Sequence, residues 1–326
     1  MAEATARAHS NIAFIKYWGN YDDELRLPSN PSISMNLDSL YTDTTVIWDD
    51  SLVNDVLVLN DKPAAQAATE RVSRHLDHLR KRLGLQSKAH VQSVNNFPMG
   101  AGIASSASSF AALTVAAVAA AQESLSEREL TTIARLGSGS ASRSIPAGFV
   151  EWKTGTYHEE SYAETIVNPD YWDLVDVIAV VSKAHKRTTS QAGHPTAKTS
   201  DLQTARVEGA SRRLQNCRQA LLDHDFPTFA QIIEQDSNLM HAVMMTSQPP
   251  LFYWQAATLT LMELIREWRA EGLAVSYTLD AGPNVHCICL SQDAEIVKTR
   301  LQSQPDVLET FVAVPGPAAS VLSDGA

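Results

Sequence analysis

The sequence predicts a mixed α+β protein made of two domains, on three observations. The chain has 326 residues, and chains of this length usually fold into more than one domain, each with its own hydrophobic core. Segments with the alternation of strands and segments with the periodicity of helices follow one another in mixed order, without an internal repeat. Apolar residues make up 44% and charged residues 19% of the chain, as in ordinary globular proteins.

The first predicted domain covers residues 1–172. Its helices are recognised by apolar residues at a spacing of three or four, and its strands by alternation between turn residues. In chain order we expect a strand at 44–48, an amphipathic helix at 64–83, a strand at 86–94, an alanine-rich buried helix at 104–121 behind a glycine-bearing loop, and a strand at 148–152.

The second predicted domain covers residues 173–326, and it opens with an apolar strand. The expected elements are a strand at 174–181, helices near 201–222, 226–244 and 250–270, strands at 275–279 and 285–290, a helix near 292–302 and a strand near 308–314. A turn with the sequence D-A-G-P-N joins the strands at 275–279 and 285–290, where glycine and proline favour a reversal of the chain.

Charge and hydropathy exclude several classes of partner. A formal net charge of −11 would repel a phosphate backbone, so we expect neither nucleic acid nor an anionic membrane as a partner. The longest apolar tract, residues 110–121, is shorter than the roughly 20 residues that span a bilayer. The first residues lack the features of a signal peptide, so the cytoplasm is the expected compartment.

Cys217, Cys287 and Cys289 are expected to be buried reduced thiols.

Residues 95–109 combine a strand end, a glycine-bearing turn and serines that open a helix. Free N–H groups and the positive end of a helix dipole favour phosphate at such a place, and serine hydroxyls can reach phosphate oxygens or their metal. An ordinary helix start with spare capping serines would have the same pattern. Neither G-x-x-x-x-G-K-[ST] nor G-x-G-x-x-G after a strand is present, so the common nucleotide-binding folds that carry those motifs are not supported.

Three other segments carry candidate polar groups, and each is weak when taken alone. Residues 138–144 place small polar donors around Arg143, whose planar guanidinium suits a carboxylate or phosphate, although a surface loop would look similar. In residues 11–19, alternation places Lys16 on the face opposite Ile15 and Tyr17, where a lysine is usually solvated. Asp280 follows an apolar strand, where a carboxylate is commonly only a turn former.

Taken together, these segments resemble the mevalonate diphosphate decarboxylase family of the GHMP kinase superfamily, with a match from residue 7 to about 290. The resemblance rests on five motifs in one order: N-I-A-F-I-K-Y-W-G, P-S-N-P-S-I-S-M-N-L-D, N-N-F-P-M-G-A-G-I-A-S-S-A-S, S-G-S-A-S-R-S and Y-T-L-D-A-G-P-N-V. It implies a GHMP kinase fold, with an N-terminal ATP-binding domain like ribosomal protein S5 domain 2, a ferredoxin-like C-terminal domain, an active site between them, and a homodimer.

The resemblance also implies roles for individual residues. Asp280 would take the proton of the substrate's tertiary hydroxyl, Lys16 would keep Asp280 ionised, and Arg143 and Asn11 would hold the substrate carboxylate. Two further sets are implied. Substrate contacts are expected from Tyr17, Ser138, Ser140, Arg143 and Ser190. ATP contacts are expected from Asn95, Pro98, Gly100, Gly102, Ala104, Ser105 and Ser106. Mg²⁺ would bridge phosphate oxygens, and its protein ligands are left unassigned.

Two departures from the family pattern bear on the substrate. Family members that use the diphosphate commonly read K-Y-W-G-K, whereas this chain has Asn20 at the last position. The family's bacterial S-R-S-G segment aligns with S-Q-A-G, which places Gln191 where the arginine would be. Two missing charge-assisted contacts, each about 1.5–3 kcal/mol, favour mevalonate 5-phosphate over the diphosphate. The alternative is that Lys186 or Arg187 restores the charge and mevalonate 5-diphosphate is used.

Two other functions share some of these features. A GHMP small-molecule kinase would have a similar ATP loop and base but would stop after phosphorylation, and Arg143 within S-G-S-A-S-R-S argues against it. A nucleotide-binding regulator without catalysis would be expected to lack Lys16 or Asp280, and both are present. The sequence therefore predicts an ATP-dependent decarboxylase of a phosphorylated mevalonate that releases carbon dioxide and phosphate.

Overall fold

The first sheet is built around two long antiparallel strands, β1 (Glu3–Ile15) and β4 (Ser32–Asp49). The computed structural model describes residues 3–97, 105–184 and 188–323. The other strands of this sheet are β5 (Val56–Leu59), β6 (Lys62–Pro63), β7 (Lys88–Asn95), β8 (Phe149–Trp152), β9 (Ala163–Val167) and β14 (Ser320–Val321). The strand order is β14-β1-β4-β7-β5-β6, and β8 and β9 extend the sheet beside the first residues of β4.

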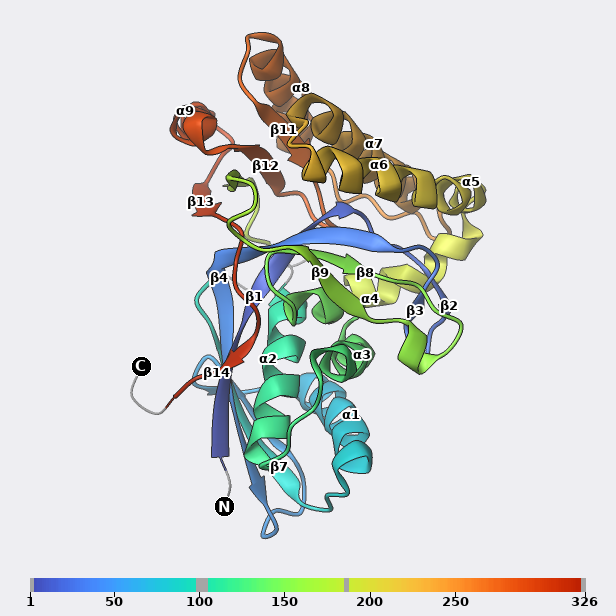
Figure 1. The fold of residues 1–326 in the computed structure, drawn as a ribbon, viewed down its shortest axis with the longest axis vertical. Helices are drawn as coiled ribbons and strands as arrows, with labels where there is room; N and C mark the ends of the chain where they lie inside the picture. The colour runs from blue at the N-terminus through green and yellow to red at the C-terminus, as the bar shows by residue number, and fades with distance from the viewer. Residues whose placement is uncertain (1–2, 98–104, 185–187, 324–326) are drawn as a thin grey trace.

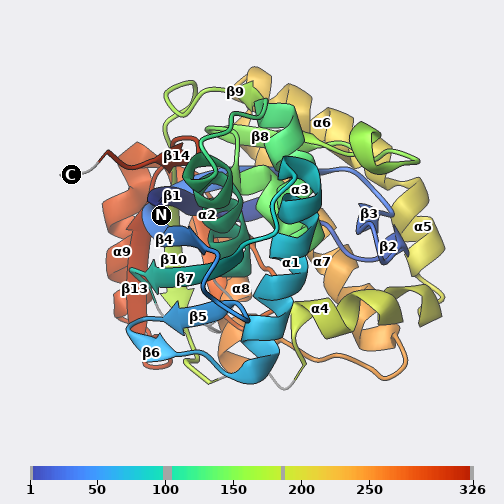
Figure 2. The ribbon, with the colours of Figure 1, turned by 90° about the horizontal axis from the view of Figure 1, so that it is seen from below.

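Three helices cover one face of this sheet: α1 (Gln66–Leu83), α2 (Ser105–Ala120) and α3 (Glu127–Gly137). Figures 1 and 2 show α2 lying along the strands, with α1 and α3 beside it. Most of α2 is buried because its small alanines allow close packing on several sides. The hydroxyl oxygen of Ser126 accepts a hydrogen bond from the Glu129 N–H, and the Glu129 carboxylate accepts one from the Ser126 N–H. Helix α3 therefore begins with a capping box.

The second sheet is antiparallel, with the order β11-β12-β10-β13. Its strands are β10 (Leu174–Val180), β11 (Val275–Thr278), β12 (Val285–Leu290) and β13 (Glu309–Ala313). Helices α6 (Ala210–Leu222) and α7 (Phe226–Thr246) pack between this sheet and strands β1 and β4. Helices α8 (Ala256–Ala270) and α9 (Ala294–Gln302) cover the opposite face. The short elements are β2 (Asn20–Asp22), β3 (Leu27–Pro28), α4 (Ser190–Gly193) and α5 (Gln203–Glu208).

This architecture confirms the predicted two-domain α+β fold. We propose that the domain boundary lies between the end of β9 and the start of β10, near residue 172 as expected. The C-terminal strand β14 nevertheless returns to pair with β1 in the first sheet. The chain therefore crosses between the two units more than once.

The observed elements differ from the sequence prediction in several places, among them the first part of β4 and the strands β5 and β9, which were not predicted. Helix α3 and most of β1 were not predicted, because their apolar residues are mixed with charged and small polar ones. The helix expected near 201–222 is divided into α5 and α6 at Gly209. The helix expected from residue 250 begins at Ala256, after Pro249 and Pro250 and behind the capping residue Gln255.

Two smaller expectations can be compared with the described residues. Cys217, Cys287 and Cys289 are buried and unpaired, as predicted. Within the described part of the chain, no helix has both the length and the apolar character required to cross a membrane.

Candidate active site

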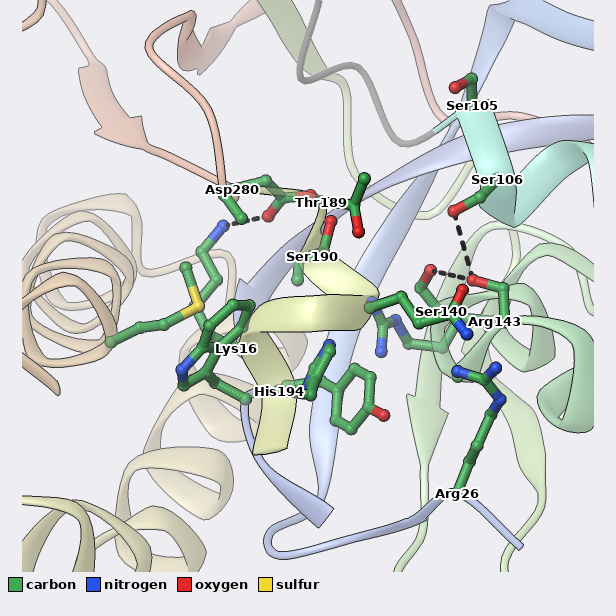
Figure 3. Close-up of a pocket in the computed structure, with 18 of the residues that line it drawn as sticks. Lys16, Arg26, Ser105, Ser106, Ser140, Arg143, Thr189, Ser190, His194 and Asp280 are labelled. Carbon is green, nitrogen blue, oxygen red and sulfur yellow. Dashed lines mark hydrogen bonds and ion pairs between the residues drawn. The ribbon is translucent and has the colours of Figure 1, made fainter. Parts of the chain in front are cut away.

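A cavity of about 290 Å³ lies where the two sheets meet, and it collects polar groups from widely separated segments. Its walls include the residues that follow β1, the start of α2, the 3-10 turn Gly139–Ser144, helix α4 and the loop between β11 and β12. Figure 3 shows Lys16 and Asp280 on one side of this cavity and Ser105, Ser106 and Arg26 on the other. The cavity is thus a place where a ligand with several anionic groups can be held.

Lys16 and Asp280 form an ion pair in the cavity wall, with 2.8 Å between Nζ and Oδ1. The Lys16 side chain is buried, whereas that of Asp280 is 25% exposed and faces the cavity. Burial lowers the pKa of Lys16, and Asp280 acts in the opposite direction. Burial alone would raise the pKa of Asp280, but neighbouring positive charge, chiefly that of Lys16, outweighs it and holds that pKa below its ordinary value. Asp280 is therefore an ionised carboxylate in a partly dry site.

The backbone of Lys16 is fixed by polar groups from the helices beneath it. Its N–H donates to Asp236 Oδ2 at 2.6 Å, and its carbonyl oxygen accepts from Arg206 Nη2 at 2.7 Å and Asn30 Nδ2 at 2.9 Å. Asp236 is itself paired with Arg213 at 2.6 Å, and both side chains are buried. This network ties Lys16 to α5, α6 and α7, so the position of its ammonium group depends on the helical layer as well as on its own segment.

The alternation expected for residues 11–19 is wrong at its end. Strand β1 stops at Ile15, and a register shift between Ala13 and Ile15 disturbs the last pairs with β4. Lys16, Tyr17 and Trp18 consequently all reach the cavity wall, instead of alternating between two faces. Lys16 is 1% exposed, so it is not the solvated face residue that local pattern favours.

Arg143 lies in the buried 3-10 turn rather than in a surface loop. Its Nη1 donates to Ser32 Oγ at 2.8 Å and its Nη2 to Asn11 Oδ1 at 3.2 Å, while the buried Nε has no hydrogen-bond partner in the part of the chain that the structure describes. Burial lowers its pKa to about 10, which still leaves the guanidinium charged at neutral pH. Asn11 lies behind Arg143, and its Nδ2 donates to Ser144 Oγ at 2.7 Å. Asn11 therefore positions Arg143.

Serine hydroxyls connect the 3-10 turn to the start of α2. Ser138 Oγ lies 3.3 Å from Ser106 Oγ and 3.4 Å from Ser140 Oγ, and all three line the cavity (Figure 3). Ser105, the first residue of α2, also lines it. These hydroxyls surround a helix N-terminus, where phosphate is favoured.

The remaining residues expected to contact ATP are either outside the described residues or outside the cavity wall. Pro98, Gly100, Gly102 and Ala104 lie outside the described residues. Asn95 ends β7, where its Oδ1 accepts from Thr42 Oγ1 at 2.6 Å, and the structure does not place it in the cavity wall.

Tyr17 is packed tightly beside the 3-10 turn. A Cβ on Gly139 would lie 2.5 Å from Tyr17 Cε1, so only glycine fits there without displacing the ring. The Tyr17 hydroxyl donates to Asn20 Oδ1 at 2.6 Å, and burial raises its pKa to about 12. Asn20 thus interacts with Tyr17 and is not itself among the described residues that line the cavity.

Ser190 and Gln191 come from α4 and line the cavity as expected for that segment. His194 follows α4 and stacks on Tyr17, with ring centroids 4.2 Å apart. Its Nδ1 accepts the N–H of Gly19 at 3.0 Å, which leaves the proton on Nε2. Burial lowers the pKa of His194 to about 3, so the ring is neutral. Lys186 and Arg187 lie outside the described residues.

Arg26, Arg71 and His194 also line the cavity, although the sequence did not predict them as site residues. Arg26 lies in the turn between β2 and β3, and Arg71 lies on α1. Neither belongs to a recognised motif, and an arginine on an amphipathic helix is ordinarily solvated. No local signal would have identified either one, because only the packing of α1 and the hairpin beside α3 brings them to the cavity.

The fold and the cavity define an enzyme of the GHMP kinase superfamily with a carboxylate, a buried lysine and a phosphate-favouring helix start in one site. Comparisons with known proteins agree. The family model for the diphosphomevalonate decarboxylase-like N-terminal domain matches residues 8–163, and that for the mevalonate 5-diphosphate decarboxylase C-terminal domain matches residues 176–313. The chain belongs to the diphosphomevalonate decarboxylase family.

Individual relatives cover most of the chain. The diphosphomevalonate decarboxylase of Candida albicans is 41% identical over 87% of this chain and 83% of its own length. The human enzyme of that name is 38% identical over 87% of this chain and 76% of its own length.

Solved structures agree in fold over nearly the whole length. The mevalonate diphosphate decarboxylase of Staphylococcus aureus has a TM-score of 0.93 at 34% identity, over 99% of this chain and 98% of its own. A second structure, described as a complex with MVAPP, AMPPCP and magnesium, has a TM-score of 0.93 at 35% identity, over 98% of this chain and 99% of its own.

Proposed function

We propose that this chain catalyses the ATP-dependent decarboxylation of mevalonate 5-diphosphate to isopentenyl diphosphate, carbon dioxide, ADP and phosphate. The observation that carries the proposal is the buried Lys16 ammonium 2.8 Å from the Asp280 carboxylate, in the same cavity as Arg143 and the serines of α2. Family membership adds the reaction class, since the relatives are named for this activity.

Asp280 is proposed to accept the proton of the tertiary hydroxyl on one carboxylate oxygen. A hydroxyl attacks phosphorus poorly, and a positioned base typically contributes about 10²–10⁴-fold. The Asp280 carboxylate is available because Lys16 keeps it ionised. The hydroxyl oxygen then bonds to the γ-phosphorus of ATP, and ADP departs.

Decarboxylation follows from the new phosphate ester. The bond from carbon to the phosphorylated oxygen breaks and phosphate leaves, while the electrons of the bond to the carboxylate form the alkene and release carbon dioxide. Arg143 is proposed to orient the substrate carboxylate, because its buried Nε has no partner among the described residues. Asn11 acts through Arg143 by accepting from Nη2 at 3.2 Å.

The described residues of the cavity are suited to bind the phosphate groups of ATP, and they do not form a set of side chains that would bind a metal ion by itself. Ser105 and Ser106 offer hydroxyls at a helix N-terminus, where the positive end of the dipole favours phosphate. No group of three histidine, cysteine or carboxylate side chains suited to a metal occurs in the described ranges. Mg²⁺ would therefore be held by phosphate oxygens with serine hydroxyls, and it would offset the charge of the transferred group.

The diphosphate replaces the monophosphate that the sequence favoured. The relatives carry the diphosphate in their names, which supports the alternative stated in the sequence analysis. The count of missing cations also overlooked Arg26 and Arg71, which line the cavity. Mevalonate 5-phosphate is retained as a second candidate on one observation, that positions 20 and 191 carry amides where the family pattern has cations.

Two parallel assays test the proposal, each with ATP and Mg²⁺ and with both ADP and carbon dioxide measured. We expect equal yields of ADP and carbon dioxide, and a kcat/KM for the diphosphate at least tenfold above that for the monophosphate. The opposite ratio would select the second candidate. ADP without carbon dioxide would identify a kinase, and neither product would identify a regulator.

We also propose that the chain forms a homodimer, as the family resemblance implies. Its mass in solution, measured by light scattering during size-exclusion chromatography, tests this directly. A monomer mass at micromolar concentration would contradict it.

A further inference from the structure

Two arginines from distant segments, Arg26 and Arg71, line one end of the cavity. Arg26 lies in the turn that joins β2 to β3, and Arg71 lies on α1. Arg74, also on α1, is exposed and is not among the residues that line the cavity. Burial lowers the pKa of Arg71 to about 10, and repulsion by Arg26 and Arg74 acts in the same direction. Like charges held together in this way are an unfavourable arrangement that a bound anion would relieve.

Arg26 and Arg71 are anchored without being neutralised. Arg26 Nε donates to the carbonyl oxygen of Leu136 at 2.9 Å, and Arg71 Nη2 donates to that of Gly137 at 2.9 Å. These carbonyls end α3, where the helix dipole favours cations. Arg71 Nε is buried without a hydrogen-bond partner, and no ion pair between described residues includes Arg26 or Arg71. Their remaining N–H groups are available to a ligand.

The arginine end of the cavity is separate from the reacting end. In Figure 3, Ser140 and Arg143 lie between Arg26 and the Lys16–Asp280 pair. Ser105 and Ser106 lie in a third direction, at the start of α2. A substrate whose hydroxyl meets Asp280 and whose carboxylate meets Arg143 would therefore extend its far end toward Arg26.

The hairpin that carries Arg26 is also the one that lacks a cation at position 20. Strands β2 and β3 pair through Asn20 with Pro28 and Asp22 with Leu27, so Arg26 projects from the closed end of that hairpin. Its φ of 49° is left-handed, which is uncommon for a residue other than glycine. Burial lowers the pKa of Arg26, and the opposing effects of Tyr17 and Asp23 do not offset it.

We propose that Arg26, supported by Arg71, binds the terminal phosphate of the substrate and supplies the charge that position 20 lacks. The inference rests on the proposed function, because it assigns the far end of that substrate. It makes Arg26 a specificity-determining residue, since a second phosphate needs a cation that a monophosphate does not.

The test is the variant Arg26→Gln, compared with Arg74→Gln as a control that removes one neighbouring exposed positive charge outside the cavity wall. We expect Arg26→Gln to lower kcat/KM for the diphosphate by about 10- to 100-fold, mainly through KM, and to lower that for the monophosphate by less. The KM for ATP should stay within about twofold in both variants, and Arg74→Gln should resemble the unmodified enzyme.

Three results would overturn the assignment. They are equal kinetics of the two variants, equal losses for both substrates, or a rise in the KM for ATP alone. If Arg26→Gln folds poorly, Arg26→Met keeps much of the apolar length of the side chain and removes its charge, and a diphosphate KM unchanged in it would overturn the assignment as well. An unmodified enzyme that turns over neither substrate would instead defeat the proposed function, so the two failures are distinguishable.

Discussion

Lys16 and Asp280 are 264 positions apart in the sequence, and their side chains meet at 2.8 Å. The lysine follows the first strand of the first sheet, and the carboxylate follows β11 of the second. Because each unit contributes one partner, the pair exists only when both sheets pack on the helical layer between them.

Replacement of Asp280 by asparagine removes the proposed base while keeping the size of the side chain. We expect kcat to fall by about 10²–10⁴-fold, with ATP binding retained. Carbon dioxide release and ATP affinity measured by calorimetry check this, with the exposed Asp201→Asn as the control. Turnover near that of the unmodified enzyme would remove Asp280 from its role.

Lys16 should set the acid limb of the pH profile. The ionised Asp280 is the active form, so activity is lost as pH falls through its pKa, which Lys16 holds below the ordinary value of about 3.9. In Lys16→Met the positive charge that lowers the pKa of Asp280 is gone, whereas the burial that raises this pKa remains. The pKa of Asp280 should therefore rise, and the acid limb of kcat/KM should move to higher pH. A profile with the same limb in both proteins would contradict this coupling.

The buried pair Arg213–Asp236 should stabilise the fold and position the site. Asp236→Ala leaves Arg213 buried without its carboxylate, which typically costs about 3–5 kcal/mol of the free energy of unfolding. It also removes the acceptor of the Lys16 N–H, so kcat should fall as well. Urea denaturation gives the first quantity. In a double-mutant cycle with Arg213→Met, additive losses would indicate that the two side chains do not interact.

Gly139→Ala should disturb Tyr17, because the added Cβ would lie 2.5 Å from the ring. We expect a loss of about 1–3 kcal/mol in stability and a higher KM for the phosphorylated substrate. In a Tyr17→Ala background the same substitution should cost little, since the obstructing ring is absent. An equal cost in both backgrounds would mean that Gly139 is needed for another reason.

The two amide positions offer a test of substrate charge. Asn20→Lys combined with Gln191→Arg adds the cations of the family pattern, so the ratio of kcat/KM for the diphosphate to that for the monophosphate should rise about tenfold or more. The single variants show which position contributes. A ratio that stays the same in the double variant would defeat this explanation of selectivity.

The family, the two-domain α+β class and most of the regular elements could be predicted from the order of the amino acids alone. Segments such as those of α1 and α7 carry a helical period locally, because one face of each must be buried, and the segment of α2 is recognisable by its run of alanines and other apolar residues. The motifs around Lys16, Arg143 and Asp280 were also recognisable in order.

Which side chains meet, and which charges face the ligand, depends on how the distant segments pack together. Lys16 is buried because the register shift and the helices beneath it turn it inward, against the alternation of its own segment. Arg26 and Arg71 reach the cavity because α3 ends between them, and no motif contains them. Coulomb interactions depend on distance in space and on burial, neither of which can be counted along a sequence. The positive charge that faces the substrate therefore follows from packing. Positions 20 and 191 alone indicate too little of it, because they leave out Arg26 and Arg71.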